Sequence, residues 1–234
     1  MSDPTEQQPY RASGSPFAGA EFVENPEPRC ACVLIVDTSA SMQGDPIRQL
    51  TAGIASFKDE LVADTLAAKR VEIAVVGFGS VVQILSHFST PDRFVPPELE
   101  ASGETFMGTA ILQAIDLLAE RKATFNEHGL AYYRPWIFLI TDGEPTDDWS
   151  VAALRVAEGE ERRQFQFFAV GVEGANMEKL SRIARRQPLQ LKGLRFRDLF
   201  EWLSRSLQSV SRSQTGDSVP LENPATPSGW AVVG

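Results

Sequence analysis

Residues 30–41 read Cys-Ala-Cys-Val-Leu-Ile-Val-Asp-Thr-Ser-Ala-Ser, an apolar run followed by an acidic, hydroxyl-rich loop. The apolar run is short and ends abruptly at Asp37, which is typical of a buried parallel strand. A second stretch has the same design, because Trp-Ile-Phe-Leu-Ile-Thr at 136–141 runs directly into Asp142 and Gly143. In open α/β sheets, ligands bind beyond the carboxyl ends of strands, where the strand order reverses. The two acidic loops therefore indicate a site at the carboxyl ends of the strands of a sheet.

The rest of the chain alternates between strand patterns and helix patterns, which indicates one α/β domain. The strands predicted at 71–77 and 80–86 are separated by Phe78 and Gly79, a connection too short for a parallel crossover. They are therefore predicted to form an antiparallel hairpin at the sheet edge. The predicted fold is a Rossmann-like doubly wound sheet, mostly parallel with one antiparallel edge strand, with helices on both faces. The other predicted strands are 30–36, 136–141, 165–171 and about 188–192, and the predicted helices are about 45–66, 107–122, 148–162, 176–185 and 196–211.

The composition restricts the classes of protein to which the chain can belong. Its 234 residues, 43% of them hydrophobic, are enough for one sizeable core with tails. A formal net charge of -9 disfavours nucleic acid as a partner, because such binding depends on Lys and Arg neutralising phosphates. No apolar run approaches the roughly 18 residues of a membrane-spanning helix, and the N-terminus does not resemble a signal peptide. We therefore expect a cytoplasmic protein without a membrane span.

Composition also divides the chain into three parts. Residues 1–28 are rich in Pro, Ser, Gln and Glu, so we expect a flexible N-terminal segment. Residues 29–212 carry the periodic patterns and form the predicted domain, and residues 213–234 are a Pro- and Ser-rich tail. Because a lone exposed Trp230 beside valines would favour aggregation, we expect this tail to dock on the domain rather than on a partner.

Two cysteines and two histidines are the only Cys and His residues that the sequence offers to zinc. Cys30 and Cys32 alternate along the first strand, so both thiols point to one face, where small buried side chains are usual. Zinc would need four ligands, and His87 and His128 lack the spacing for it. Oxidation sensing by the pair would require exposed thiols of low pKa. We expect two buried structural cysteines.

Oxygen-bearing side chains, in contrast, collect in three loops. Asp37, Ser39 and Ser41 follow the first strand, Thr105 precedes the helix at 107–122, and Asp142 follows the strand at 136–141. Each loop alone is weak support for a site, because Ser and Asp also cap helices and form turns. Together they offer three hydroxyls and two carboxylates. This all-oxygen set suits Mg²⁺ or Mn²⁺, with Ca²⁺ as a further candidate, better than zinc.

The three loops resemble the metal-ion-dependent adhesion site of von Willebrand factor A domains, in the same chain order and over about residues 30–211. Asp37, Ser39 and Ser41 match the family's first-loop motif, Thr105 its second-loop threonine and Asp142 its third-loop aspartate. The resemblance implies that the three hydroxyls ligate the ion directly and that the two aspartates hold ordered waters. A partner's Asp or Glu would then complete the metal shell, so that metal and partner bind with positive coupling.

Finer details are similar to the bacterial TerY-type branch, which is associated with tellurite resistance. They are Pro-Arg-Cys-x-Cys at 28–32, Thr-Asp-Gly-Glu-Pro-Thr-Asp at 141–147 and Gly-Trp-Ala at 229–231. This resemblance implies a role in a stress response, with TerD-like proteins or a kinase and phosphatase pair as partners. Glu104 stands where the second glycine of the family's double glycine often occurs, which implies either an added carboxylate near the metal or altered access to it. Thr109 is the alternative to Thr105 as second-loop ligand, although the pattern Gly108-Ala110 after Thr105 favours the latter.

Three other hypotheses fit parts of the pattern. In the first, the Ser and Asp residues only cap helices in a Rossmann-like domain that binds no metal. The second is a Mg²⁺-dependent phosphotransferase or phosphatase of the haloacid-dehalogenase type, with Asp37 as nucleophile, but such enzymes need a second Asp where Ser39 stands. The third is the subunit of an ATPase or chelatase complex with the same fold. The non-enzymatic binding module accounts for all three loops and is the function that we predict.

Overall fold

A computed structural model describes residues 22–217, 219–226 and 229–233, and within them the strands form a seven-stranded sheet in the order β3-β2-β1-β4-β5-β6-β7. The strands are β1 (Cys30–Asp37), β2 (Val71–Phe78), β3 (Val82–Ser89), β4 (Trp136–Thr141), β5 (Gln166–Gly171), β6 (Leu189–Leu191) and β7 (Ala231–Val233). The helices are α2 (Asp45–Ala63), α3 (Ala67–Arg70), α4 (Met107–Glu127), α5 (Ser150–Glu161), α6 (Met177–Ile183) and α7 (Phe196–Arg212), with a short 3-10 turn η1 (Ala40–Met42).

The sheet is doubly wound, as the sequence predicts. β1 pairs in parallel with β2 on one side and with β4 on the other, so the strand order reverses between β1 and β4. β3 runs antiparallel to β2, which confirms the predicted edge hairpin. At the other edge β7 runs antiparallel to β6 and adds a second antiparallel strand that the sequence did not predict. Three residues at the end of a Pro-rich tail are too few to show a strand period.

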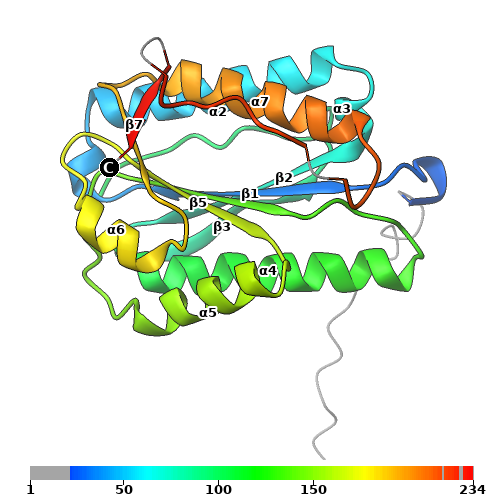
Figure 1. Ribbon diagram of the computed structural model, residues 1–234. Helices are drawn as coiled ribbons and strands as arrows, with labels where there is room; N and C mark the ends of the chain where they lie inside the picture. The colour runs from blue at the N-terminus through cyan, green and yellow to red at the C-terminus, as the bar shows by residue number, and fades with distance from the viewer. Residues whose placement is uncertain (1–21, 218, 227–228, 234) are drawn as a thin grey trace, which may run out of the picture.

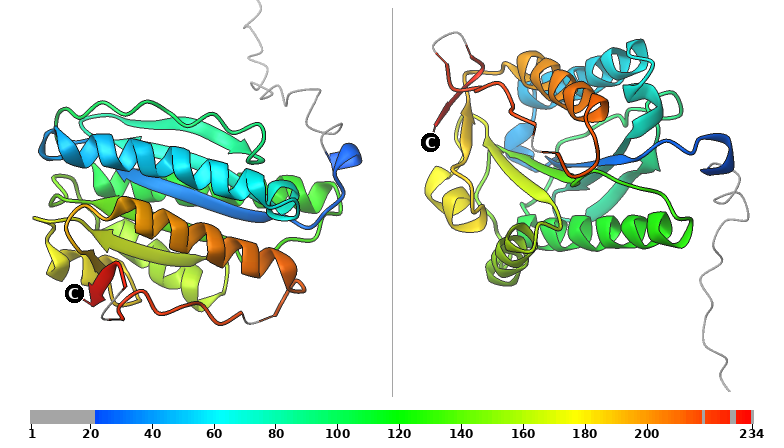
Figure 2. Two further views of the ribbon diagram at one scale, coloured as in Figure 1. Left: turned by 90° about the horizontal axis from the view of Figure 1, so that it is seen from above. Right: turned by 45° about the vertical axis from the view of Figure 1, so that its right-hand side comes forward.

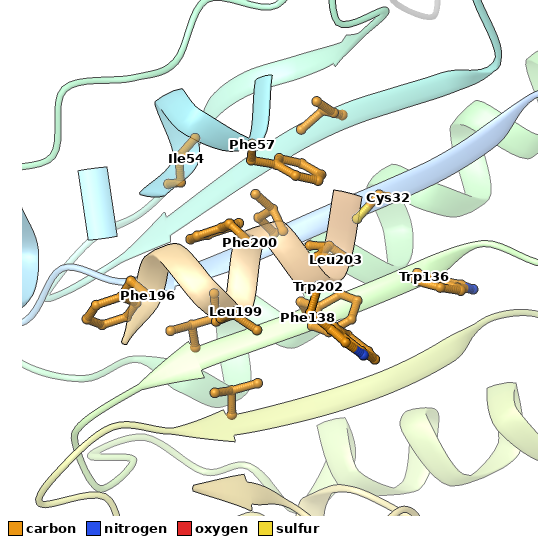
Figure 3. Packing of buried hydrophobic residues seen from close by; sticks show 14 of the residues in the cluster. Cys32, Ile54, Phe57, Trp136, Phe138, Phe196, Leu199, Phe200, Trp202 and Leu203 are labelled. Atoms are coloured by element: carbon orange, nitrogen blue, oxygen red, sulfur yellow. The ribbon is translucent and has the colours of Figure 1, made fainter. Parts of the chain in front are cut away.

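Helices cover both faces of the sheet, as predicted. α2 and α7 lie side by side over one face, and α4, α5 and α6 lie over the other (Figures 1 and 2). α7 presents an apolar stripe that includes Phe196, Leu199, Phe200 and Leu203 to the sheet, where these side chains meet Phe138 of β4 and Phe57 of α2 (Figure 3). Burial of such side chains, at about 1.5–3 kcal/mol each, fixes the helix on the sheet.

Two predicted helices begin or end at different residues because aspartates stop them. The helix predicted at 45–66 ends at Ala63, where Asp64 Oδ1 accepts hydrogen bonds from the backbone N–H groups of Leu66 and Ala67. The helix predicted at 148–162 begins at Ser150, whose N–H donates to Asp148 Oδ1. Such local side-chain bonds compete with the helical hydrogen bonds.

Both ends of the described chain contact the domain. Residues 1–21 of the predicted N-terminal segment lie outside the described residues, but Phe22 is buried and its ring centroid lies 6.3 Å from that of Phe125. In the C-terminal tail, Trp230 is 4% exposed and its ring centroid lies 5.6 Å from that of Trp202. The Lys192 N–H donates to the carbonyl oxygen of Trp230. Residues 231–233 therefore extend the sheet of the domain.

Cys30 and Cys32 are completely buried in the face of the sheet that α2 and α7 cover. Burial raises the pKa of the Cys30 thiol to about 12, with a further contribution from Glu72, and also raises the pKa of Cys32. Thiols in this state are inert. Among the described residues, no helix has the length and hydropathy needed to cross a membrane.

Candidate metal centre

The predicted metal-ligating loops lie at the switch point of the sheet. Because β1 and β4 are adjacent and parallel, their carboxyl ends lie next to each other. Asp37 at the end of β1 and Asp142 just after β4 are therefore close together. The loop before α4 joins them through its backbone, since Ser102 N–H donates to Thr38 O and Ala40 N–H donates to Gly103 O. The carboxyl ends of strands at such a point form the usual ligand crevice of this sheet type.

Asp37 is the buried centre of the cluster. Its side chain is fully shielded from solvent, and both of its oxygens accept hydrogen bonds. Oδ1 accepts from the Ser39 N–H at 2.8 Å, and Oδ2 accepts from the Thr141 hydroxyl at 2.5 Å. Thr141 was not among the predicted site residues. Its contact spans 104 positions in the chain, so no local sequence pattern could have shown it.

A chain of hydroxyls connects the first loop to the third. Ser39 Oγ lies 3.0 Å from Ser41 Oγ, and the Ser41 hydroxyl donates to Asp142 Oδ1 at 2.6 Å. Ser39 and Asp142 are buried, with 2% and 9% exposure, whereas Ser41 is exposed. The cluster is therefore deep at Asp37 and opens to solvent at Ser41.

Thr105 lies against the same cluster. A Cβ atom built on Gly143 would lie 3.3 Å from Thr105 Oγ1 and 3.5 Å from Asp37 Oδ2, so the absence of a side chain at Gly143 leaves space between these two oxygens. The backbone of Thr105 is fixed to the third loop, because its N–H donates to Thr146 Oγ1 and its carbonyl oxygen accepts from the Thr146 N–H. The structure thus brings all five predicted residues together.

The alternative ligand, Thr109, has a different role. Its hydroxyl donates to Asp147 Oδ2 at 2.8 Å, and the N–H groups of Gly108 and Thr109 also donate to the Asp147 carboxylate. Asp147 therefore caps the N-terminus of α4 from 38 positions away in the chain. In the sequence Asp147 is only one member of the motif at 141–147, so its capping role was not predicted. The hydroxyl of Thr109 is engaged by Asp147, and Thr105 is the threonine that lies at the cluster.

Two further acidic residues lie in the second and third loops. Glu144 forms an ion pair with Lys179 at 2.9 Å, and its carboxylate also accepts from Asn176, contacts that lower its pKa. Glu104 is exposed, and its backbone N–H donates to Ser80 Oγ. The carboxylates that form hydrogen bonds within the cluster are those of Asp37 and Asp142.

The electrostatics of the cluster favour a cation. Burial raises the pKa of Asp37, an effect that its hydrogen bonds from Ser39 and Thr141 oppose and that the nearby Asp142 increases. Burial also raises the pKa of Asp142, against the hydrogen bond from Ser41. Burial makes the two carboxyl groups costly to ionise on their own. Their ionisation becomes favourable when a positive charge lies between them.

The donor set fits a hard divalent cation. Hydroxyl and carboxylate oxygens are the ligands that Mg²⁺ prefers, and Gly143 leaves room among them. In the part of the chain that the structure describes, no group of three or more His, Cys, Asp or Glu residues is arranged to hold a metal. A cation in this cluster would therefore depend on the hydroxyls of Ser39, Ser41 and Thr105 as well as on the two aspartates.

Gly143→Ala tests whether the space beside Thr105 and Asp37 matters. The added methyl group would approach Thr105 Oγ1 more closely than ordinary contacts allow, while every oxygen donor stays in place. We expect Mg²⁺ affinity to fall at least tenfold, with a loss of stability of only about 1 kcal/mol, a typical value for a single substitution. Calorimetric titration and thermal unfolding measure the two effects. An unchanged affinity would contradict a cation position beside Gly143. Gly129→Ala, in a turn where a Cβ meets no neighbour, is the control for metal binding.

Several solved structures share this fold at low sequence identity. The pilus adhesin SpaC from Lactobacillus rhamnosus GG is 12% identical with a TM-score of 0.63, and the match covers 78% of this chain and 30% of the adhesin. Proximal thread matrix protein 1 from the mussel byssus is 18% identical with a TM-score of 0.54, over 77% of this chain and 48% of that protein. BatB from Bacteroides thetaiotaomicron, a conserved hypothetical protein, is 15% identical with a TM-score of 0.52, over 79% of this chain and all of BatB.

The chain thus spans less than half the length of SpaC and of the mussel protein, and at these identities the likeness concerns the fold alone. No curated protein matches the sequence. The family model of the von Willebrand factor type A domain matches residues 32–197, which is most of the chain. The chain therefore belongs to the von Willebrand factor type A domain family.

Proposed function

We propose that this chain is a non-enzymatic protein-interaction module that binds a divalent cation, with Mg²⁺ or Mn²⁺ preferred and Ca²⁺ as an alternative, and through it an Asp or Glu of a protein partner. The observation that carries the proposal is the convergence of three hydroxyls and two carboxylates at the carboxyl ends of β1 and β4, in a cluster that reaches the surface at Ser41. Ser39, Ser41 and Thr105 would hold the ion directly, and Asp37 and Asp142 would hold it through ordered water.

The bound ion would supply a positive charge at the surface that attracts a carboxylate. Neutral hydroxyl ligands leave most of this charge uncompensated, whereas direct carboxylate ligands would reduce it. The protein's own contribution is to fix the donors before the partner arrives. Asp37 is held by Ser39 and Thr141, and Asp142 is held by Ser41. Such supporting contacts orient metal ligands and are part of a site's affinity.

The geometry favours binding over phosphoryl transfer. A nucleophilic aspartate needs a free oxygen that can attack the substrate. Asp37 is fully buried and both of its oxygens accept hydrogen bonds within the protein. Ser39 occupies the position where a haloacid-dehalogenase-type enzyme needs its acid-base aspartate. These features support a module that holds a ligand without transforming it.

The cellular setting that we propose rests on the TerY-type motifs at 28–32, 141–147 and 229–231. They favour a bacterial, cytoplasmic stress-response system linked to tellurite, with TerD-like proteins or a kinase and phosphatase pair as partners. The alternative is a subunit of an ATPase or chelatase complex with the same fold. Co-purification in Mg²⁺-containing buffer separates the two: TerD-like partners support the first, and an ATPase supports the second.

Thr105→Ala tests the metal site itself. Calorimetric titration of Mg²⁺ and Mn²⁺ into metal-stripped protein is expected to show saturable binding that weakens at least tenfold in this variant, because a direct oxygen ligand is lost. Thr109→Ala is the matched control, since the same hydroxyl is removed four residues away where it only bonds Asp147. We expect Thr109→Ala to cost about 1 kcal/mol of stability as a capping contact but to leave metal affinity within twofold.

Equal losses of affinity in the two threonine variants would contradict the assignment of Thr105. Absence of binding in the wild-type protein, with or without a carboxylate-bearing partner, would instead favour the hypothesis that these loops only cap helices.

A further inference from the structure

Charged side chains line a second pocket, where β4 and β5 begin and away from the metal loops. Arg134 precedes β4, Arg163 lies between α5 and β5, and Arg185 and Arg186 follow α6. With Glu160 and Glu161 they surround a cavity of about 330 Å³, which we call the arginine pocket. Its lining has two more positive than negative side chains, in a chain whose formal net charge is -9. The pocket is therefore a positively charged site on a chain whose net charge is negative.

Two of the arginines are held in place by the protein. Arg134 donates from Nε to the carbonyl oxygen of Phe165 at 2.8 Å and from Nη2 to that of Glu160 at 3.0 Å. Arg186 donates from Nε to Glu160 Oε1 at 2.9 Å. The Glu160 carboxylate is only 5% exposed and also accepts from the Phe167 N–H. Glu160 is thus committed to the protein and neutralises only one of the four guanidinium groups.

The other two arginines have no anionic partner within the described residues. Arg163 and Arg185 are both exposed and form no ion pair in that part of the chain. The positive charges also affect one another, because Arg186 and Arg163 add to the effect of burial in lowering the pKa of Arg134, while Glu160 opposes it. The protein has gathered more positive charge here than its own glutamates balance.

Arg163 also occupies a backbone conformation that suits glycine. Its φ of 54° is the only positive value for a non-glycine residue among those described. It lies at the C-terminus of α5, where the N–H of Gln164 donates to Gly159 O and the N–H of Arg163 donates to Glu160 O. Helices end this way most readily with glycine at this position, because a Cβ is strained there. An outlier of this kind points to a function of the side chain rather than to a need of the fold.

We propose that the arginine pocket binds a doubly charged phosphate group. Guanidinium groups present planar pairs of N–H donors that match phosphate oxygens, and they remain charged at any physiological pH. A carboxylate would neutralise only one of the two excess charges, whereas a phosphate monoester carries close to two at pH 7. Free phosphate and the phosphorylated side chain of a partner share this chemistry, and both are accommodated by a pocket that is open to solvent.

Arg163→Gly separates a ligand-binding role from a structural one. Inorganic phosphate is titrated into the metal-stripped, full-length chain at constant ionic strength, and the arginine Nε–Hε resonances are followed by NMR. We expect saturable shifts for the four pocket arginines. In Arg163→Gly the affinity is expected to fall at least fivefold while the melting temperature rises, because glycine relieves the strained backbone. Glu161→Gln is expected to strengthen phosphate binding.

Arg162→Ala is the matched control, because it removes the same charge from the neighbouring position, which does not line the pocket. Its phosphate affinity should stay within twofold of wild type. An equal loss in Arg162→Ala, or identical shifts with chloride at the same ionic strength, would show general screening and overturn the proposal. A blocked phosphoserine amide that binds more tightly than inorganic phosphate would identify a phosphorylated partner as the source. Tighter binding of inorganic phosphate would identify the free ion, and either result supports the site.

Discussion

Asp37→Asn is expected to abolish detectable Mg²⁺ binding and, at the same time, to make the metal-free protein more stable. The variant keeps the size of the side chain and an oxygen for one hydrogen bond, but it removes the negative charge from the deepest position of the cluster. Burial disfavours that charge in the absence of metal. The charged Asp37 carboxylate thus lowers the stability of the metal-free protein but is necessary for metal binding.

The direction of the pH dependence follows from the raised pKa of Asp37. Because the carboxyl group holds its proton more tightly in the folded state, its contribution to stability is fully present below the unfolded pKa of about 3.9. That contribution is lost as the pH rises through the folded pKa. Above its folded pKa, the wild-type protein without metal therefore bears the full cost of the buried charge. The asparagine variant does not titrate and should lack this component of the pH dependence.

Thermal unfolding between pH 4 and pH 8, with chelator or with Mg²⁺, measures both effects. Without metal, we expect the variant to gain about 1 kcal/mol, the scale of an uncompensated buried polar group. For a chain of this size that corresponds to roughly 2–4 °C. With Mg²⁺ at 100 times its Kd, the wild type should gain about 2.7 kcal/mol and the variant nothing.

Asp116→Asn is the control for removal of a carboxylate, because Asp116 is exposed and pairs only with Arg155 at the surface. It should leave both the metal response and the pH profile unchanged. A metal-dependent rise in melting temperature for Asp37→Asn that equals the wild-type rise would show that Asp37 is not part of the metal site.

Features formed by residues that are neighbours in sequence were predicted most accurately. β1 and β4 could be placed almost to the residue because a strand buried on both faces is a continuous apolar run that ends at a polar loop. The chemistry of Asp37, Ser39 and Ser41 was visible for the same reason, since these residues are neighbours in sequence. Their proximity to Thr105 and Asp142 followed from the strand order. That they bind a metal stays a prediction.

Contacts between distant residues were not predictable in the same way. Thr141 donates to Asp37 across 104 positions, and Asp147 caps α4 across 38, yet in the sequence Thr141 is only the last residue of a predicted strand and Asp147 an ordinary loop residue. Strand β7 pairs with β6 at the end of a tail whose Trp230 packs against Trp202 of α7. The arginines of the pocket come from three separate segments. Such features depend on which distant residues the fold brings together, and a single sequence shows no local pattern for those contacts.

Glu72→Gln is expected to cause the largest loss of stability of the substitutions considered. Glu72 lies in β2, a strand predicted only from its apolar residues, and its carboxylate is completely buried. It forms ion pairs with Arg29 at 3.0 Å and with Arg121 at 2.7 Å. Arg29 is itself fully buried, and the amide of the variant would leave it without a negative partner. Breaking a buried pair in this way costs about 3–5 kcal/mol.

The loss should also spread along the chain, because Arg29 anchors the approach to β1. Its other nitrogens donate to the carbonyl oxygens of Glu27 and Asn25, and its guanidinium lies 5.6 Å from the ring centroid of Phe22. Chemical denaturation gives the free energy of unfolding, and amide hydrogen exchange at Asn25, Glu27 and Arg29 reports the local effect. Glu178→Gln, which breaks an exposed pair with Arg182, should cost well under about 1 kcal/mol.

A double variant decides whether the cost comes from the unpaired charge or from lost packing. The double variant Arg29→Met with Glu72→Leu replaces both charges with apolar side chains of similar length. The side chain of Arg121, the other partner of Glu72, is 13% exposed and can turn toward solvent. If an isolated buried charge is the cause, the double variant should be more stable than Glu72→Gln alone, as for other buried ion pairs replaced by apolar residues. A double variant less stable than the single one would show that the hydrogen bonds of Arg29 to the N-terminal segment contribute more than its charge balance with Glu72.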